Sequence, residues 1–193
     1  MDKMERRACL IELRQGDDKK LRGYAAVFNS YSEEMWGFKE KIMPGAFRDA
    51  IAKSDVRALW NHNPDYVLGR NRSGTLTLNE DEKGLYIEID PPDTQWARDL
   101  LVTINRGDVN QMSFAFTVDK ANWDEVDDGM AVRTIEKIRE LYDVSPVTYP
   151  AYSDTDIGLR SAKDILDEYR GQKQSRESVD ILKLKLELKN REV

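Results

Sequence analysis

The sequence contains a single histidine, so any chemistry that uses an imidazole must use His62. This residue lies in the run Trp60-Asn61-His62-Asn63-Pro64, directly after a predicted strand. Loops at strand ends often present functional groups, and a neutral imidazole can accept a proton near neutral pH. His62 is therefore a candidate general base, although a lone histidine is also commonly a structural or surface residue.

Ser113 is the candidate nucleophile. It is a hydroxyl residue near the start of the apolar run Asn110-Gln111-Met112-Ser113-Phe114-Ala115-Phe116. In a strand, alternation would place Ser113 on one face with Ala115 and Thr117, and the large apolar residues on the other. The alternative is a strand serine whose hydroxyl bonds to the backbone. No G-x-S-x-G motif surrounds it, which excludes an α/β-hydrolase elbow.

Asp143 is the candidate acid that would orient the histidine and stabilise its protonated form, as the acid does in a serine triad. It lies in the run from Leu141 to Val147. Glu140, Glu136 and the acidic loop Asp124–Asp128 compete for this role, and each could instead be a solvated charge. Strand alternation would turn Glu140 away from the face that holds Asp143.

Other chemistries fit the sequence poorly. One histidine and one cysteine cannot make a typical zinc site, and no glycine-rich phosphate-binding motif is present. Cys9 lies in an apolar run, where we expect a buried and inert thiol. No cofactor and no metal are expected.

Short apolar runs separated by turn signals predict a body made mostly of strands. They follow one another without a strand–helix–strand rhythm, which favours a barrel or sandwich over a parallel sheet. The expected strands are Ala8–Arg14, Leu21–Phe28, Val56–Trp60, Gly74–Leu78, Leu85–Ile89, Met112–Val118 and one or two strands within Val132–Val144.

Two helices interrupt these strands. One is expected from Pro44 to about Lys53, and the other over Asp93–Arg106. The second could begin at a cap formed by Asp93 or Thr94 and end at Gly107. Its apolar residues recur at helical spacing, which indicates packing against the core.

The segment after about residue 160 is predicted to be a separate tail. Ser161 to Asp164 has the pattern of a capping box that opens a third helix, and Gly171–Ser178 has the composition of a linker. Ile181–Leu188 fits a strand or a helix, and its lysines and glutamates favour the helix. We therefore expect a domain over 1–160 and a tail over 161–193, used for targeting or removed by autocleavage. The alternative is that its leucines pack on the body.

Composition limits the classes of function. The chain has 193 residues, a formal net charge of −6 and one cysteine. The acidic balance argues against broad binding of nucleic acid, and the single cysteine suits a reducing compartment. No apolar run has the length of a membrane span, and the first residues lack the apolar core of a signal peptide. These features predict a cytoplasmic location with no membrane partner.

The order of these motifs resembles the HK97-type prohead proteases of tailed phages. A Trp-x-His loop is followed by a helix, a Met-Ser-Phe strand and an acidic residue in a Val-Ser-Pro-Val-Thr run. The matching segments are Arg22–Phe28, Met43–Phe47, Leu59–His62, Asn110–Phe116 and Asp143–Tyr152, spread over roughly residues 20–160. Each is short, but five in the right order give a strong combined signal.

The resemblance implies a small closed or partly open β-barrel of the herpesvirus-protease type, mainly β with flanking helices. It implies a catalytic set of His62, Ser113 and Asp143, although the phage proteins often have glutamate at the position of Asp143. Oxyanion donors near Leu68-Gly69-Arg70 are a guess based on the glycine.

The function implied is a serine endopeptidase that acts in the host cytoplasm, inside the procapsid. Its substrates would be scaffold or the scaffold-like segment of the major capsid protein, and the protease itself. Self-association is possible, and no specific nucleic acid is expected. The alternative is a non-enzymatic capsid assembly factor with the same fold.

Overall fold

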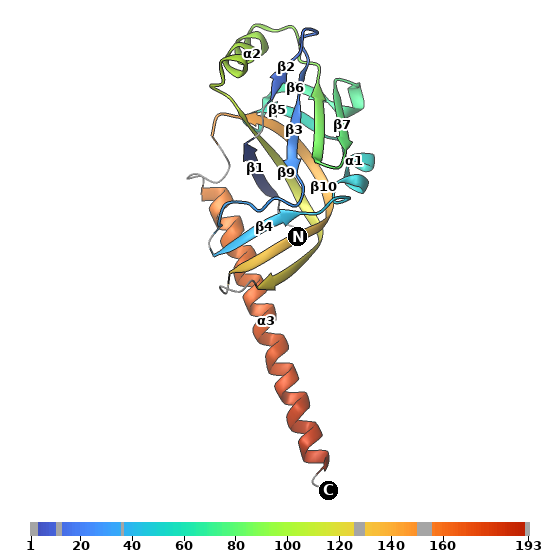
Figure 1. The fold of residues 1–193 in the computed structure, drawn as a ribbon, viewed down its shortest axis with the longest axis vertical. Helices are drawn as coiled ribbons and strands as arrows, with labels where there is room; N and C mark the ends of the chain where they lie inside the picture. The colour runs from blue at the N-terminus through green and yellow to red at the C-terminus, as the bar shows by residue number, and fades with distance from the viewer. Residues whose placement is uncertain (1–3, 11–12, 36, 126–129, 150–155, 192–193) are drawn as a thin grey trace.

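The computed structural model describes most of the chain, namely residues 4–10, 13–35, 37–125, 130–149 and 156–191. Among the described residues, strands outnumber helices, which confirms the prediction of a mainly β protein with some helices. Figure 1 shows the strands gathered in one body from which a single long helix extends.

The larger sheet carries the candidate site and is built around two long antiparallel strands, β9 (Gln111–Glu125) and β10 (Ala131–Val147). The strand order is β1-β9-β10-β5-β6, and β4 also pairs with β10. Both β4 and β5 run parallel to β10 but join it at different places along its length. The remaining strands are β1 (Glu5–Leu10), β4 (Phe38–Ile42), β5 (Arg57–Trp60) and β6 (Asn63–Arg70).

The smaller sheet has the order β2-β3-β8-β7. Its strands are β2 (Arg14–Gln15), β3 (Leu21–Val27), β7 (Leu76–Glu80) and β8 (Gly84–Ile89). The two sheets share one apolar core, in which residues such as Leu21 and Ile87 of the small sheet join Met112 and Phe114 of β9. Burial of these side chains removes apolar area from water and fixes the register of both sheets.

Neither sheet closes on itself within the described residues, so the closed form of the predicted barrel is wrong. The likeness to the herpesvirus-protease fold is not confirmed by this arrangement. A barrel needs its first and last strands to pair, whereas β1 and β6 end the main path of the larger sheet.

Two strands were missed by the sequence analysis. In β4, buried Phe38, Glu40 and Ile42 alternate with half-buried lysines. Because the middle buried residue is a glutamate, the sequence does not show the apolar alternation typical of a strand. The second, β6, begins beside Pro64, a residue that argues against a central strand. Its position at the end of the strand order makes the proline tolerable.

The two short helices lie near their predicted positions. The first, α1 (Arg48–Lys53), begins later than expected because residues 44–47 form turns. The second, α2 (Gln95–Arg106), ends at Gly107, whose φ of 83° suits glycine. Thr94 is the N-cap residue but makes no side-chain capping bond. Ala97, Leu100, Leu101 and Ile104 are buried, which confirms the core-facing stripe.

The C-terminal segment forms one continuous helix, α3 (Asp156–Arg191). Helix is thereby confirmed over Ile181–Leu188, but the predicted linker over Gly171–Ser178 and the predicted start at Ser161 are wrong. One glycine in a helix costs about 1 kcal/mol, and the surrounding Gln, Lys, Arg and Glu residues are good helix formers.

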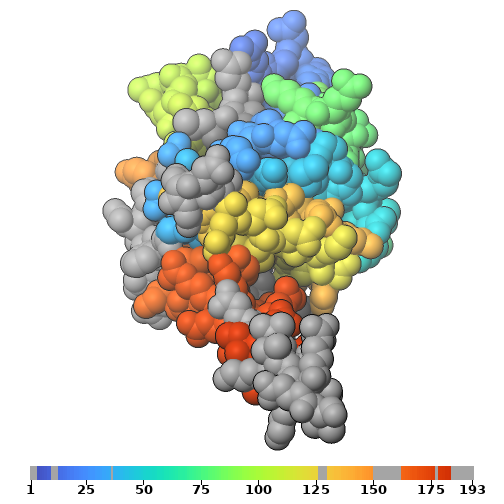
Figure 2. Space-filling model, turned by 60° about the horizontal axis from the view of Figure 1, so that its bottom comes forward, coloured from blue at the N-terminus to red at the C-terminus, as the bar shows by residue number. Residues whose placement is uncertain are grey.

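The beginning of α3 packs on the body and its later part extends away from it (Figures 1 and 2). Ala162 and Leu166 are buried beside Phe38 of β4. The ring of Tyr169 stacks on Trp123 of β9, with centroids 4.5 Å apart. Further along, Ile181 and Leu182 are more than half exposed. No described helix is both long and apolar enough to span a membrane.

Candidate active site

His62 lies in a two-residue turn between β5 and β6. Trp60 and Asn63 pair across the turn, and Asn61 and His62 have φ values of 54° and 56°. Two positive φ values are typical of a type I′ hairpin, which normally carries asparagine or glycine. A histidine in this conformation is strained, and such strain persists only where the surroundings impose it.

Asn61 fixes this turn to the end of β10. Its backbone N–H donates to the carbonyl of Pro146 at 3.0 Å. Its side-chain Oδ1 accepts from the N–H of Thr148 at 2.9 Å, and its Nδ2 donates to Thr148 Oγ1 at 3.3 Å. These three bonds hold the turn over β10, so the imidazole of His62 is directed at the sheet.

Ser113 lies on β9 directly below this turn. It pairs with Ala8 of β1 on one side and with Ser145 of β10 on the other, and it is fully buried. Its Oγ lies 2.7 Å from Nε2 of His62. The neighbouring Phe114 packs on Phe47 on the opposite, core-facing side of the strand, as the predicted alternation requires.

Asp143 lies on the opposite side of the imidazole. Its Oδ1 is 2.5 Å from Nδ1 of His62, and the two side chains are only 10% and 9% exposed. The same oxygen accepts a hydrogen bond from the buried Ser145 Oγ at 2.6 Å. The structure therefore brings all three predicted residues together, with the imidazole between a hydroxyl and a carboxylate.

This arrangement can move a proton from the serine to the histidine. When Nδ1–H donates to the carboxylate, Nε2 is free to accept from the serine hydroxyl. Exclusion of water strengthens the attraction between the carboxylate and a protonated imidazole. The same geometry occurs in serine hydrolases with unrelated folds, so it does not by itself identify the family.

Comparison with known proteins decides the family. Residues 8–168 match the family model described as the caudovirus prohead serine protease. The chain belongs to this family. It is also 32% identical, over 161 residues, to the prohead protease of Enterobacteria phage HK97, an alignment that covers 80% of this chain and 67% of that protein. No solved structure gives a significant match.

Membership makes this chain a serine peptidase of phage capsid maturation. The matched region contains all three residues of the hydrogen-bonded chain and ends within the first turns of α3. The resemblance predicted from five short motifs is thereby confirmed.

The competing carboxylates of the prohead protease lie elsewhere. Glu140 is exposed on β10, whereas Asp143 is buried. Glu136 forms an ion pair with Lys120 at 2.6 Å. Asp124 is exposed, and residues 126–128 of the acidic loop lie outside the described part of the chain. Of the carboxylates that the structure describes, Asp143 is the one bonded to the histidine.

Two further sequence expectations have clear outcomes. Cys9 is half-buried rather than fully buried, its Sγ donates to the carbonyl of Ala25 at 3.0 Å, and burial of the thiol raises its pKa to about 12, which disfavours the reactive thiolate. The guess about oxyanion donors near Gly69 gains no support. A Cβ there would lie 2.5 Å from the carbonyl oxygen of Thr75, so the close approach of the backbone at Thr75 explains the glycine.

The sequence pattern does not single out the residues that support the site, namely Asn61, Ser145 and Thr148. Ser145 could have been found, because two residues along one strand share a face and a serine hydroxyl can reach a carboxylate there. Nothing local predicts the bond between Asn61 and Thr148, which are 87 residues apart. Among the described residues, no three His, Cys, Asp or Glu side chains converge as metal ligands.

Proposed function

We propose that Ser113, His62 and Asp143 are the catalytic triad of this peptidase and that it is an endopeptidase of the procapsid. The observation that carries the proposal is the unbroken chain of short contacts from Ser113 Oγ through both imidazole nitrogens to Asp143. A buried, aligned chain of this kind is what nucleophilic catalysis by serine requires.

The reaction would run in two halves. His62 Nε2 takes the proton of Ser113 as Oγ attacks the scissile carbonyl, and then gives that proton to the leaving amine. The acyl group remains on Ser113. His62 next takes a proton from a water molecule, which attacks the ester and releases the second product with Ser113 reprotonated. Throughout, Asp143 holds the Nδ1–H and stabilises the imidazolium without taking its proton.

Ser145 and the strained turn would prepare this chain before the substrate arrives. The hydroxyl of Ser145 fixes one rotamer of Asp143. The turn that Asn61 secures to β10 fixes the position of His62. Preorganised groups need no rearrangement during reaction, which is the main source of electrostatic catalysis.

The proposed substrates are the scaffold, or the scaffold-like segment of the major capsid protein, together with the protease itself. The support for them is the family description, which names a prohead, and the resemblance of the motifs. The proposed place of action is the inside of the procapsid in the host cell. A protease that assembles with its substrates would meet them there at high local concentration.

Co-expression with the capsid and scaffold proteins of the same phage tests this proposal. Intact-mass spectrometry should find these proteins shortened beside the wild-type chain and full-length beside Ser113→Ala. Ser73→Ala, which changes an exposed serine outside the hydrogen-bonded chain at His62, is the matched control and should process normally. Normal assembly with unprocessed proteins beside the wild type would favour a non-enzymatic assembly factor instead.

A further inference from the structure

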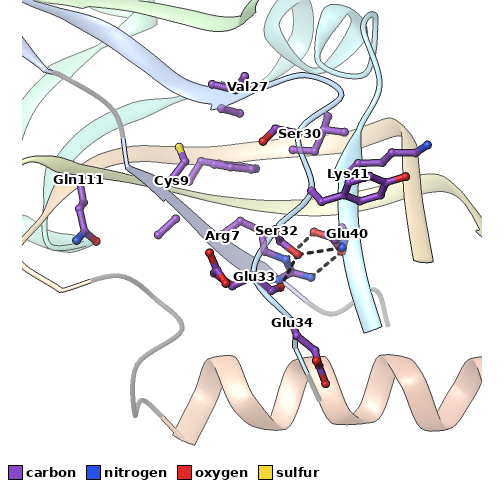
Figure 3. A pocket seen from close by; sticks show the side chains of 15 residues that line it. Arg7, Cys9, Val27, Ser30, Ser32, Glu33, Glu34, Glu40, Lys41 and Gln111 are labelled. Atoms are coloured by element: carbon purple, nitrogen blue, oxygen red, sulfur yellow. Dashed lines mark hydrogen bonds and ion pairs between the residues drawn. The ribbon is translucent and has the colours of Figure 1, made fainter. Parts of the chain in front are cut away.

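A groove with a volume of about 660 Å³ lies beside the strand that flanks the nucleophile strand (Figure 3). One wall is β1, through Arg7 and Cys9, and the other is the segment 30–34. The floor is largely apolar and includes Ala26, Ile42 and Phe114. The groove is separate from the chain of contacts at Ser113, and the proposed mechanism does not use it.

Within the described part of the chain, no strand pairs with the outer edge of β1. In the larger sheet β1 pairs with β9 and ends the strand order of the described residues. The outer N–H and C=O groups of such a strand can bond to an additional extended chain. Addition of a strand to a free edge is a common way to bind peptides, with main-chain bonds for affinity and side-chain pockets for selectivity.

The opposite wall is held in place by β4. Asn29 N–H donates to the carbonyl of Ile42 at 3.0 Å, and Met35 N–H donates to that of Phe38 at 2.7 Å. Between them, the backbone N–H of Ser32 donates to the carbonyl of Glu40 at 2.8 Å. The backbone N–H of Glu40 donates to the hydroxyl of Ser32 at 2.9 Å. The wall is thus fixed at three points along its length. A preformed groove avoids part of the entropy cost of binding.

The free charge of the groove is negative. Arg7 and Glu40 line it but neutralise each other through a contact of 2.6 Å. Lys41 lies over the ring of Tyr31, 5.5 Å from its centroid, and keeps a positive charge that offsets one of the two glutamates of the opposite wall. Glu33 and Glu34 are exposed and form no ion pair with any residue that the structure describes. An occupant with lysine or arginine side chains would complement these two carboxylates.

The groove lies close to Ser113 but on the other face of the sheet. Phe114, on its floor, points away from the face that holds Ser113, while Ala8 of β1 is the register partner of Ser113. A chain added to β1 would lie about two strand spacings, or roughly 10 Å, from the nucleophile. A polypeptide can cross that distance with about three extended residues.

We infer that this groove is a substrate-capture site for an extended apolar segment that carries lysine or arginine. The segment would bind along β1 with its cationic side chains at Glu33 and Glu34, at least about three residues from the bond cut at Ser113. The identity of the occupant as substrate rests on the proposed function. Binding itself does not, because it needs neither Ser113 nor His62.

The experiment uses the full chain with Ser113→Ala, so that no peptide is cut. Fluorescence anisotropy at low salt would measure the binding of a labelled peptide of alternating valine and lysine, beside one of alternating valine and glutamate. The lysine peptide should bind, and the glutamate peptide should bind at least about tenfold more weakly. Adding Glu33→Gln and Glu34→Gln should weaken the lysine peptide about tenfold, the effect of losing two exposed ion pairs.

Two controls locate the effect. Asp17→Asn with Glu82→Gln removes the same charge from exposed sites elsewhere and should leave the affinity unchanged. Hydrogen exchange should show peptide-dependent protection in Arg7–Cys9 and segment 30–34, and none in Leu76–Ile89. Absence of binding, equal binding of both peptides, or protection confined to other segments would overturn the inference. None of these outcomes bears on the triad, which the processing experiment tests separately.

Discussion

The larger sheet contains two buried polar clusters, which differ in whether every charge has an oppositely charged partner. The site cluster consists of His62, Ser113, Asp143 and Ser145. The ionic cluster consists of Glu5, Arg7, Glu40 and Arg133, all with less than a tenth of their surface exposed. Both link β9 or β1 to β10, and both are excluded from water.

The ionic cluster is a closed ring. Arg7 contacts Glu5 and Glu40 at 2.6 Å each, and Arg133 contacts the same two carboxylates at 2.6 and 2.9 Å. Every formal charge in it faces two opposite charges. Burial of charged groups is costly, and pairing of this kind offsets the cost without leaving a group free to react.

The site cluster is an open chain. It contains one carboxylate, and the chain ends on the neutral hydroxyl of Ser113. Charge balance there is completed only when His62 takes a proton, which is the step that creates the nucleophile. A buried polar cluster in which every charge is paired therefore stabilises the fold. A buried polar cluster that ends on a neutral hydroxyl can transfer a proton and so support a reaction.

The largest expected effect comes from substitutions that remove the nucleophile or the base of the site cluster. Ser113→Ala and His62→Ala should each lower kcat about a million-fold, since the members of such a set act as a unit. Circular dichroism should show an unchanged fold. Turnover of a processed capsid or scaffold peptide by either variant at near wild-type rates would contradict the assignment.

The next effect concerns the acid. Asp143→Asn should lower kcat about 10⁴-fold, because an amide can leave the imidazole in the wrong tautomer. Glu140→Gln, three residues earlier on β10 and exposed, should change the rate by little. Steady-state kinetics of both variants decides the matter, and the reverse ranking would move the role to Glu140.

Breaking the closed ring should affect stability rather than catalysis. Glu40→Gln leaves Arg7 and Arg133 short of one carboxylate charge, and loss of one member of a buried ion pair costs about 3–5 kcal/mol. Urea unfolding would measure the loss. Glu88→Gln, which breaks the more exposed pairs with Lys20 and Arg22, is the control and should cost much less. Normal stability of Glu40→Gln would show that the ring contributes little.

Acid should weaken the ionic cluster. Burial alone would raise the pKa of Glu40, but Arg7 and Arg133 outweigh it and hold the pKa below its ordinary value of 4.5. The stabilisation from Glu40 is therefore fully present above that value and is lost as the pH falls through the lower, folded-state pKa.

Unfolding midpoints measured across acidic pH would test this. Stability should fall as the pH drops below the ordinary glutamate value of 4.5. In Glu40→Gln the acid-dependent part of the stability loss should be smaller. An equal acid-dependent loss of stability in Glu40→Gln would show that Glu40 is not its source.

The smallest effect is expected from shortening α3, which leaves both clusters intact. A chain that ends at Gly171 keeps Ala162, Leu166 and the stack of Tyr169 on Trp123, but loses the exposed Ile181 and Leu182. It should remain folded and cut a substrate supplied in trans, yet enter procapsids less efficiently if the tail has a targeting role. An insoluble product would show that the later part of α3 belongs to the core.

Much of the site could be predicted because its residue types are few. One histidine leaves a single candidate base, and the motif order points to Ser113 and Asp143. The ionic cluster could not be predicted. Its charged residues lie in strands, where the alternation of residue types suggests that they face solvent. Its contacts join residues distant in sequence: Arg7 and Glu40 are separated by 33 positions, and Glu5 and Arg133 by 128. For the same reason β4 was not predicted, because its charged residues obscure the alternation of buried and half-buried positions.

Local features follow from the amino-acid sequence alone, namely the β7–β8 hairpin, the apolar stripe of α2, the helical end of the chain and the types of the reacting residues. Tertiary contacts set which carboxylate reaches the imidazole and how a strained turn is held over β10. The reason is that His62 lies 51 residues from Ser113 and 81 from Asp143. Strand propensity assigns a side chain to a face, whereas its partner across the sheet depends on a register that the whole core sets.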